Sequence, residues 1–308
     1  MSCPVRDSIR EIDDNSWLIG DILLLSRRSL PVPEAPCPEA TWTDATGSYY
    51  IVKAQHPLPL SRPLSDTSPL KKVYDAGDAT AVWIFGDAVC KVKLIYDPDE
   101  TREYDTLYAL SKRPLSFMIP EIYYYTECDG RYYLFLRKMP GETLMEAWHK
   151  ANEDIKQGYA SQMVDICKEL AIWQADRITG IDGRHLSDQY LVFRDSKDFS
   201  HETLKKNCEE VGMDCSTFHF YHCDLGPGNI FVDADAQRIV GVIDWETAGF
   251  VPKEWIRTKF CVSSGLNFDL EADEATKGEW RARVQGELED HGYPQLAHER
   301  MAWSERNN

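Results

Sequence analysis

A short polar loop, HCDLGPGN, places His222, Asp224 and Asn229 around a Gly-Pro-Gly turn. Neither a helix nor a sheet requires this set of side chains, so we treat them as candidates for chemistry. The next residues, 230–245, contain two runs rich in β-branched residues, IFVD and RIVGVIDW, separated by the polar sequence ADAQ. This pattern predicts an antiparallel hairpin that begins directly after the loop.

The predicted hairpin brings Asn229 and Asp244 together. If its turn centres between Ala236 and Gln237, the two residues lie opposite each other with Cβ atoms about 5 Å apart. Mg²⁺ prefers one or two carboxylates together with phosphate oxygens and water. An amide and a carboxylate alone hold it weakly, so we expect a polyphosphate to supply the other ligands. The spacing therefore predicts a site for a Mg²⁺-nucleotide.

Asp224 lies on the loop before Asn229 and is expected beside the phosphate that is transferred. A carboxylate in this place can orient a substrate hydroxyl and accept its proton. For His222 we expect a different task, in which a buried imidazole bonds backbone groups and shapes the loop. Cys223 is expected to fill space beside the aspartate.

The chain is strongly acidic, with 34 Lys and Arg residues against 51 Asp and Glu residues and a formal charge of −17. Such a field repels nucleic-acid phosphates and anionic membranes, so we expect neither as a partner. No obligate protein partner is evident either. A cationic small molecule would be attracted, although the same charge also promotes solubility, and both interpretations stay open.

The nine cysteines are scattered without a CxxC pair or a His/Cys cluster, which indicates reduced thiols. The acidic start, MSCPVRDSIREIDDN, lacks the features of a secretory signal. The apolar run WLIGDILLL is about nine residues long and carries Asp21, which makes it too short to span a bilayer. We therefore expect a cytoplasmic protein.

A length of 308 residues predicts two lobes, each with its own core. Residues 1–70 are interpreted as an N-terminal extension that packs on the lobes. Residues 71–139 are expected to form a β-rich nucleotide-binding lobe. Residues 140–308 are expected to form a helical lobe with the catalytic loop, the metal hairpin and the substrate pocket.

Within these parts the pattern predicts several elements. A short helix is expected from about Ser16 to Arg27, and three antiparallel strands are expected from Lys71 onward. A helix follows with Asp97 as its N-cap and Pro98 as its first residue. The next hairpin has Asp129-Gly130 at its tip. Helices are expected in SQMVDICKELAIWQA, by its apolar spacing, and after residue 253.

HCDLGPGN followed by IDWE resembles the catalytic and metal-binding loops of the aminoglycoside phosphotransferase and choline kinase family, a branch of the protein-kinase-like superfamily. The resemblance extends from about Lys71 to Trp255, and IDWETAGFVPKEW is most similar to the fungal members. It implies a two-lobed α+β fold, with a small antiparallel sheet and one helix in one lobe and a larger, mostly helical second lobe. By this resemblance Asp224 matches the catalytic aspartate, while Asn229 and Asp244 match the metal ligands.

The resemblance also implies a lysine for the nucleotide phosphates and a glutamate that holds it. Lys91 and Lys93 alternate onto one face of a strand, and only one of them can take this role. Lys91 fits the family pattern better, and Lys93 stays open as the alternative. Glu103 is the matching carboxylate, because it shares a helical face with Leu107 and Leu110 and points toward the core, where an unpaired charge is costly.

The segment YLFLRKMPGETL resembles the link between the lobes, where the backbone from Leu136 to Met139 would bond the adenine edge. Arg137 stands where the family often has an acidic residue, so no side-chain role is carried over there. The turn from Asp75 to Thr80 would lie over the phosphates, although it lacks the full Gly-x-Gly-x-x-Gly pattern. An ordinary hairpin turn is an equal interpretation of this segment.

These features predict ATP- and Mg²⁺-dependent transfer of the γ-phosphate to a hydroxyl of a small molecule. The alternatives are a kinase-like nucleotide-binding protein without turnover and a protein kinase. The second alternative is disfavoured because IDWETAGFVPKEW leaves little room for an activation segment. Glu246, Glu254 and the carboxylates of NFDLEADEATKGEW can line a pocket for a cationic acceptor, or they can form a solvated helix face.

Overall fold

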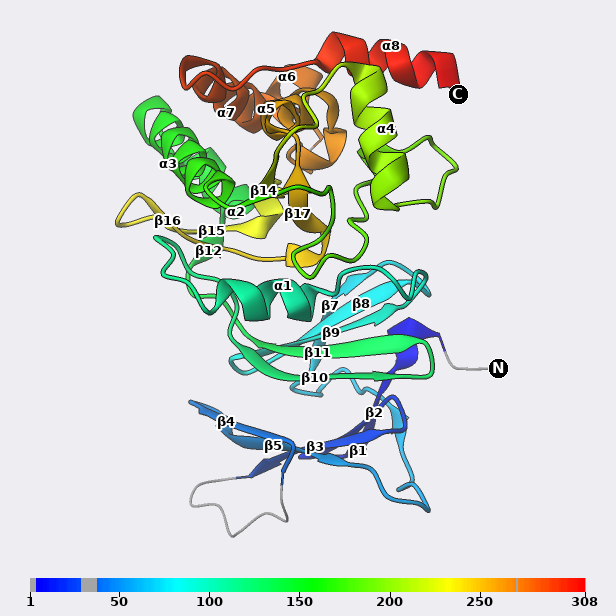
Figure 1. Cartoon of the computed structure of the whole chain (residues 1–308). Helices are drawn as coiled ribbons and strands as arrows, with labels where there is room; N and C mark the ends of the chain where they lie inside the picture. The colour runs from blue at the N-terminus through cyan, green and yellow to red at the C-terminus, as the bar shows by residue number, and fades with distance from the viewer. Residues whose placement is uncertain (1–3, 29–37, 270, 308) are drawn as a thin grey trace. The chain divides into compact units, whose positions relative to one another are not determined.

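A computed structural model describes residues 4–28, 38–269 and 271–307. By their contacts these residues form two compact units, Met1–Pro98 with Pro120–Lys138 and Asp99–Ile119 with Met139–Asn308. The first unit consists of antiparallel sheets and the second is mostly helical (Figure 1), which confirms the predicted α+β class. Residues 99–119 group with the helical unit, and the predicted lobe boundaries at 70 and 139 stay a prediction. In the described ranges, no helix is long and apolar enough to cross a membrane.

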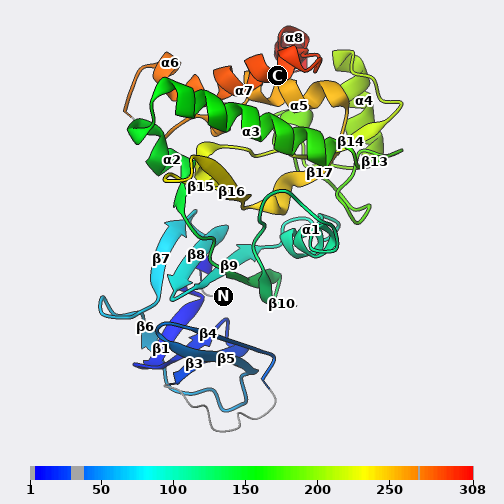
Figure 2. The ribbon, with the colours of Figure 1, turned by 90° about the vertical axis from the view of Figure 1, so that its left-hand side faces the viewer.

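The first unit contains two antiparallel sheets that pack face to face (Figures 1 and 2). One sheet has the strand order β4-β5-β3-β2-β1-β6 and the other has the order β10-β11-β9-β8-β7. The strands are β1 Ile9–Asp13, β2 Ser16–Ile19, β3 Leu23–Arg28, β4 Ala40–Asp44, β5 Gly47–Lys53, β6 Arg62–Pro63, β7 Lys71–Asp75, β8 Thr80–Phe85, β9 Ala88–Leu94, β10 Ile122–Cys128 and β11 Arg131–Arg137.

Both sheets contribute to one apolar core. Trp17, Trp42 and Tyr49 enter it from the first sheet, and Trp83 and Phe135 enter it from the second. The rings of Trp42 and Tyr49 stack with centroids 5.4 Å apart. Because large aromatic side chains bury much apolar area, the N-terminal sheet supplies a substantial part of the stability of this unit.

The prediction of a helix from about Ser16 to Arg27 is wrong, because this segment forms the hairpin of β2 and β3. Gly20 and Asp21, between the two strands, both have a φ of 59°. A Gly-Asp pair between apolar runs is typical of a two-residue hairpin turn. This local signal outweighs the helical interpretation of the segment. A Cβ atom at Gly20 would lie 2.2 Å from the hydroxyl oxygen of Tyr133, so glycine is required there.

The strands expected after Lys71 are confirmed as β7, β8 and β9, and the next hairpin is β10 and β11 with Asp129-Gly130 at its tip. In β9, Cys90 and Val92 enter the shared core. Lys91 and Lys93 therefore lie on the opposite face of the sheet, as their alternation predicted.

The second unit carries two small sheets, β12-β15-β16 and β13-β14-β17, among its helices (Figure 1). The expected helices are confirmed after residue 253 and in SQMVDICKELAIWQA as far as Ala171, whereas the last four residues, IWQA, lie beyond the helix and Gln174–Ala175 form a strand. The helices are α1 Glu103–Leu110, α2 Leu144–Ala147, α3 Glu153–Ala171, α4 His201–Val211, α5 Lys253–Val262, α6 Glu274–Lys277, α7 Glu279–Asp290 and α8 Ala297–Asn307. The strands are β12 Glu142–Thr143, β13 Gln174–Ala175, β14 Phe218–His222, β15 Ile230–Asp233, β16 Arg238–Val242 and β17 Ala248–Val251.

Helix α1 begins at Glu103 and not at Pro98 as predicted. The residues before it pair with a distant segment of the same unit. The N–H of Thr101 donates to the carbonyl of His185 at 3.0 Å, and the N–H of His185 donates to the carbonyl of Asp99 at 2.8 Å. These backbone bonds keep the segment extended, so tertiary pairing overrides a favourable local cap.

The shared core predicts that a cavity in the N-terminal sheet destabilises the first unit. Ile19 on β2 is fully buried. Ile19→Ala should lower the free energy of unfolding by about 2–4 kcal/mol in denaturant titrations followed by near-UV circular dichroism. The control Val73→Ala, on the exposed strand β7, should change it by less than about 0.5 kcal/mol. Equal stabilities for the two variants would contradict the role of the N-terminal sheet in the core.

Candidate functional site

The imidazole of His222, at the end of β14, joins two backbone segments of the second unit. Its Nδ1 atom accepts a hydrogen bond from the N–H of Asp224 at 3.1 Å, and its Nε2 atom donates to the carbonyl of Ile243 at 3.0 Å. A neutral ring with its proton on Nε2 satisfies both bonds. The ring is fully buried against the edge of Trp245. The predicted loop-shaping role of His222 is confirmed.

Asp224 and Asn229 face each other across the Gly-Pro-Gly turn. The side-chain amide of Asn229 donates to the backbone carbonyl of Asp224 at 2.9 Å and to its carboxylate at 3.1 Å. The N–H of Asn229 also bonds the carbonyl of Gly226 at 3.0 Å. These contacts leave the amide oxygen of Asn229 directed away from Asp224, where it can act as a ligand.

The hairpin of β15 and β16 is present, but the predicted pairing of Asn229 with Asp244 is off by one residue. The N–H of Ile243 donates to the carbonyl of Asn229 at 2.9 Å, so Ile243 is the residue opposite. The turn causes the difference, because Asp233 pairs with Arg238 and the turn therefore centres one residue earlier than predicted; the β-bulge between Phe231 and Val232 then shifts the pairing back by one residue, toward the predicted register. Asp244 follows the strand in a left-handed conformation, with φ 66° and ψ 56°.

Asp244 belongs to a cluster of three carboxylates in the second unit. Oxygen atoms of Glu103, Asp244 and Glu246 all lie within 4.8 Å of one another. Glu103 is buried and accepts the N–H of Trp245 at 3.1 Å. Three such groups repel each other, and a hard cation with oxygen ligands, such as Mg²⁺, fits this donor set. Glu246, which was not predicted as a metal ligand, belongs to the same cluster as the predicted ligand Asp244.

The carboxyl group of Asp224 is in an unfavourable electrostatic environment. Burial, and next the negative charge of Asp244, raise its pKa from 3.8 to about 6. The positive charge of Lys259 and the hydrogen bond from Asn229 act in the opposite direction. The folded, metal-free protein therefore carries a cost for ionised Asp224 at neutral pH.

Sequence reasoning missed the buried ion pair of Asp188 and Lys259. Lys259 on α5 contacts one carboxylate oxygen of Asp188 at 2.6 Å, and the indole N–H of Trp255 donates to the other at 2.9 Å. The Lys259 ammonium also lies 4.2 Å from the ring centroid of Tyr190. The available signal was a lysine four residues after Trp255, on the apolar face of an expected helix.

The residues predicted to contact the nucleotide are divided between the two units. On β9, Lys91 pairs with Val82 and Leu134 of the neighbouring strands. Lys91 is buried, whereas Lys93 on the same face is half-buried. Lys91 and Lys93 belong to the first unit, whereas Glu103 belongs to the second.

Leu136 lies on β11 of the first unit, where it pairs with Val89 and is buried. Met139 begins the long second part of the other unit. Its terminal methyl group approaches Gly241, where a Cβ atom would be 2.2 Å away. The contribution of Leu136 and Met139 to nucleotide binding stays a prediction.

A polar hollow of about 410 Å³ lies in the second unit beside the loop of Asp224. A Cβ atom at Gly226 would lie 3.2 Å from the carbonyl of Gly265, which lines the hollow. Two of the carboxylates predicted for an acceptor pocket, Asp269 and Glu274, also line it, while Glu246 and Glu254 do not. The complete lining is Ser264, Gly265, Asn267, Phe268, Asp269, Glu274 and Lys277.

The raised pKa of Asp224 predicts a pH-dependent gain in stability for Asp224→Asn in metal-free protein. Because the pKa is higher in the folded state, the folded protein binds the proton more tightly, and the free energy of unfolding falls as pH rises from about 4 to 6. The amide avoids this loss. At about 1.4 kcal/mol per pKa unit, the variant should be more stable than the wild type by about 2–3 kcal/mol at pH 7.5.

Denaturant titrations with EDTA, from pH 4.5 to pH 7.5, test this expectation, and the difference should shrink toward the lower pH. Asp176→Asn is the control, since Asp176 is exposed and its substitution removes the same charge. A gain that is equal for both variants, or independent of pH, would refute the explanation.

The sequence of this chain matches the model of a known protein family. The model of the Phosphotransferase enzyme family matches residues 73–252, which is more than half of the chain. No curated protein matches closely enough to count as a relative.

Two similar solved structures are of a thermostable mutant of aminoglycoside phosphotransferase APH(4)-Ia, as ternary complexes with hygromycin B. The complex with AMP-PNP has 17% identity and a TM-score of 0.51, and the match covers 80% of this chain and 86% of that chain. The complex with ADP has 16% identity and a TM-score of 0.50, with 76% and 83% covered. At these identities the likeness shows the fold, which is the kinase-like fold that the sequence predicted. By the family match, the chain belongs to the phosphotransferase enzyme family.

Proposed function

We propose that this protein transfers the γ-phosphate of ATP, with Mg²⁺, to a hydroxyl group of a small molecule. The observation that carries the proposal is the arrangement around His222, which holds Asp224 near Asn229 and Asp244 within one unit. Membership in the phosphotransferase enzyme family supports it.

In this proposal Asp224 orients the acceptor hydroxyl and accepts its proton, and its raised pKa suits a group that gains a proton during the reaction. The Asn229 amide oxygen and the Asp244 carboxylate hold the metal, and Glu246 is positioned to support them. Bound Mg²⁺ would neutralise charge that develops on the phosphate oxygens. The chain itself contributes mainly by positioning these groups on a rigid loop.

For the nucleotide, we propose Lys91 as the phosphate-binding lysine and Glu103 as its partner, with Lys93 as the alternative. The burial of Lys91 favours it over the more exposed Lys93. At the link, the N–H groups of Arg137 and Lys138 already donate to Glu121 and Asp87. Adenine recognition is therefore assigned to the backbone carbonyls from Leu136 onward and to the N–H of Met139.

For the acceptor, we propose that it occupies the hollow beside Gly226 and Gly265. Asp269 and Glu274 line this hollow together with Lys277, which forms an ion pair with Glu274 at 3.2 Å. The excess of carboxylates, together with the net charge of −17, favours a cationic acceptor.

A protein kinase is disfavoured as the alternative. Strand β17 ends at Val251 and helix α5 begins at Lys253, so one residue separates them. An activation segment on which a protein substrate docks does not fit there. A nucleotide-binding protein without turnover is distinguished by measurement, because it binds Mg²⁺-ATP and releases no ADP.

We also propose a cytoplasmic location, no nucleic-acid, membrane or obligate protein partner, and closest similarity to the fungal members of the family. The seven described cysteines are free thiols, which supports a reducing compartment. The Asp-Trp-Glu sequence at 244–246 supports the similarity to the fungal members.

Replacing Asp224 by Ala tests the proposed reaction. Loss of a positioned general base typically costs 10²–10⁴-fold, so we expect phosphate transfer to fall by at least about 100-fold. Binding of Mg²⁺-ATP, measured by isothermal titration, should not weaken, because a nearby negative charge is removed. The acceptor for this assay is identified by a screen of amino alcohols, sugars and aminoglycosides, in which mass gain of the compound and release of ADP are measured. Equal turnover by Asp224→Ala would refute the assignment.

Replacing Asp244 by Ala tests the proposed metal site. We expect the Kd for Mg²⁺-ATP to rise by about tenfold or more, since one ligand and its charge are lost. Asp233→Ala is the matched control, because Asp233 lies at the far end of the same hairpin. Unchanged Mg²⁺-dependent binding in Asp244→Ala would place the metal elsewhere.

A further inference from the structure

The carbonyl of Leu225, the residue directly after Asp224, accepts a hydrogen bond from the indole N–H of Trp280 at 3.0 Å. Both residues are fully buried. Trp280 is the second residue of α7 and lies more than 50 residues after the loop in the sequence. In the interior such a bond is strong and directional, because no water replaces it.

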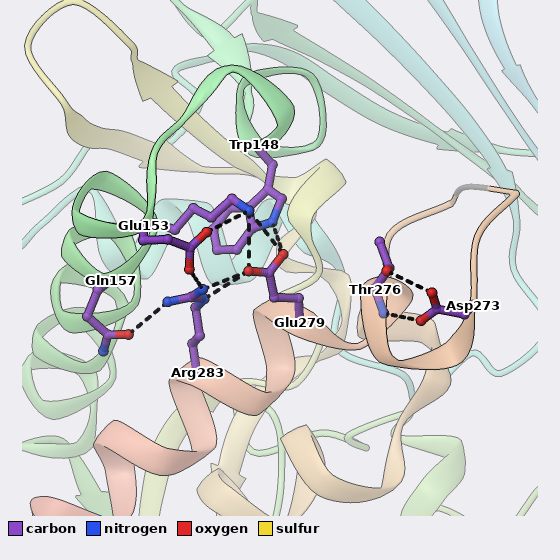
Figure 3. Close-up of polar contacts among 8 residues, drawn as sticks. Trp148, Glu153, Gln157, Asp273, Thr276, Glu279 and Arg283 are labelled. Carbon is purple, nitrogen blue, oxygen red and sulfur yellow. Dashed lines mark hydrogen bonds and ion pairs between the residues drawn. The ribbon is translucent and has the colours of Figure 1, made fainter.

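The position of Trp280 is fixed by its neighbour Glu279, which begins α7. The Glu279 carboxylate accepts bonds from the indole N–H of Trp148 at 2.9 Å, from Lys156 at 3.2 Å and from Arg283 at 2.7 Å. Figure 3 shows Trp148 and Arg283 converging on Glu279 from different segments. The ring of Trp148 also meets Trp280 edge-on, with centroids 5.7 Å apart. The first turn of α7 is thereby tied to α3 and to the segment after α2.

The backbone around Asp224 is thus held on both sides. His222 accepts the N–H of Asp224, and Trp280 donates to the carbonyl one residue later. Between these two bonds, few backbone torsions remain that can turn the carboxylate. The residue after Leu225, Gly226, lies close to the carbonyl of Gly265, so the loop packs against a residue that lines the hollow.

We propose that Trp280 is a positioning residue for Asp224. Its indole N–H fixes the peptide between Leu225 and Gly226, one residue beyond Asp224, and so helps to direct the carboxylate toward the acceptor hydroxyl. This inference rests on the proposed function. A misplacement of about 1 Å can cost about 100-fold in rate, so the loss of one anchoring bond is expected to reduce turnover while nucleotide binding is preserved.

Trp280→Phe removes the N–H and retains an aromatic ring. The probe is Mg²⁺-ATP with water as the acceptor, measured as Mg²⁺-dependent release of phosphate. We expect kcat to fall by about tenfold and the KM for Mg²⁺-ATP to stay within about twofold, because the bond acts on Asp224 and not on the nucleotide. A merely structural defect would not produce this split between kcat and KM.

Trp303→Phe is the matched control. Trp303 on α8 is equally buried and also donates one indole bond, to Glu210 at 2.9 Å. It should lose comparable stability and keep kcat within about twofold of the wild type. Should Trp280→Phe not fold, 3-benzothienylalanine at position 280 keeps both rings and replaces only the N–H by sulfur.

The outcomes separate the inference from the proposed function. Wild-type kcat in a folded position-280 variant, or an equal loss of kcat in Trp303→Phe, overturns the role of Trp280 and leaves the proposed function intact. If the wild type itself shows no Mg²⁺-ATP turnover, with water or with amino alcohols and aminoglycosides, the proposed function fails and the inference fails with it.

Discussion

The imidazole of His222 is the interaction on which the candidate site depends. With one acceptor and one donor nitrogen, it joins the N–H of Asp224 to the carbonyl of Ile243. Ile243 directly precedes Asp244, so one ring sets the relative position of the two aspartates. A residue with only one polar atom in this place leaves one of the two segments without its buried partner. The polar loop and the end of the hairpin therefore form a single rigid piece.

This arrangement concentrates negative charge where folding alone would avoid it. Asp224 carries a raised pKa because of burial and the nearby Asp244, and Glu103 and Glu246 lie close to Asp244. The positive charge of Lys259 offsets part of this charge, and Lys259 itself forms an ion pair with Asp188. Sites that bind a cation and a polyphosphate commonly accept such strain, because binding relieves it.

In the first unit, the sheet that carries Lys91 depends on the N-terminal sheet for its packing. The family match begins at residue 73, yet the sheet that follows has one apolar face covered by strands β1 to β5. Trp17, Tyr49 and Trp83 belong to one core across this division. The strand that carries Lys91 is thus stabilised from its other face by residues outside the matched region. The stability of this unit, and the nucleotide binding proposed for Lys91, are expected to depend on both sheets.

The sequence by itself determined the residue types of the loop, the existence of the following hairpin, the strands after Lys71 and the kinase-like class. These features follow from local patterns, since turn residues, alternation and motif spacing act over a few residues. Tertiary structure decided the rest. The exact place of the hairpin turn, together with a β-bulge, put Asn229 opposite Ile243, and pairing with His185 delayed α1. The contacts of Lys259 with Asp188 and of Trp280 with Leu225 join residues more than 50 positions apart, which no local pattern encodes.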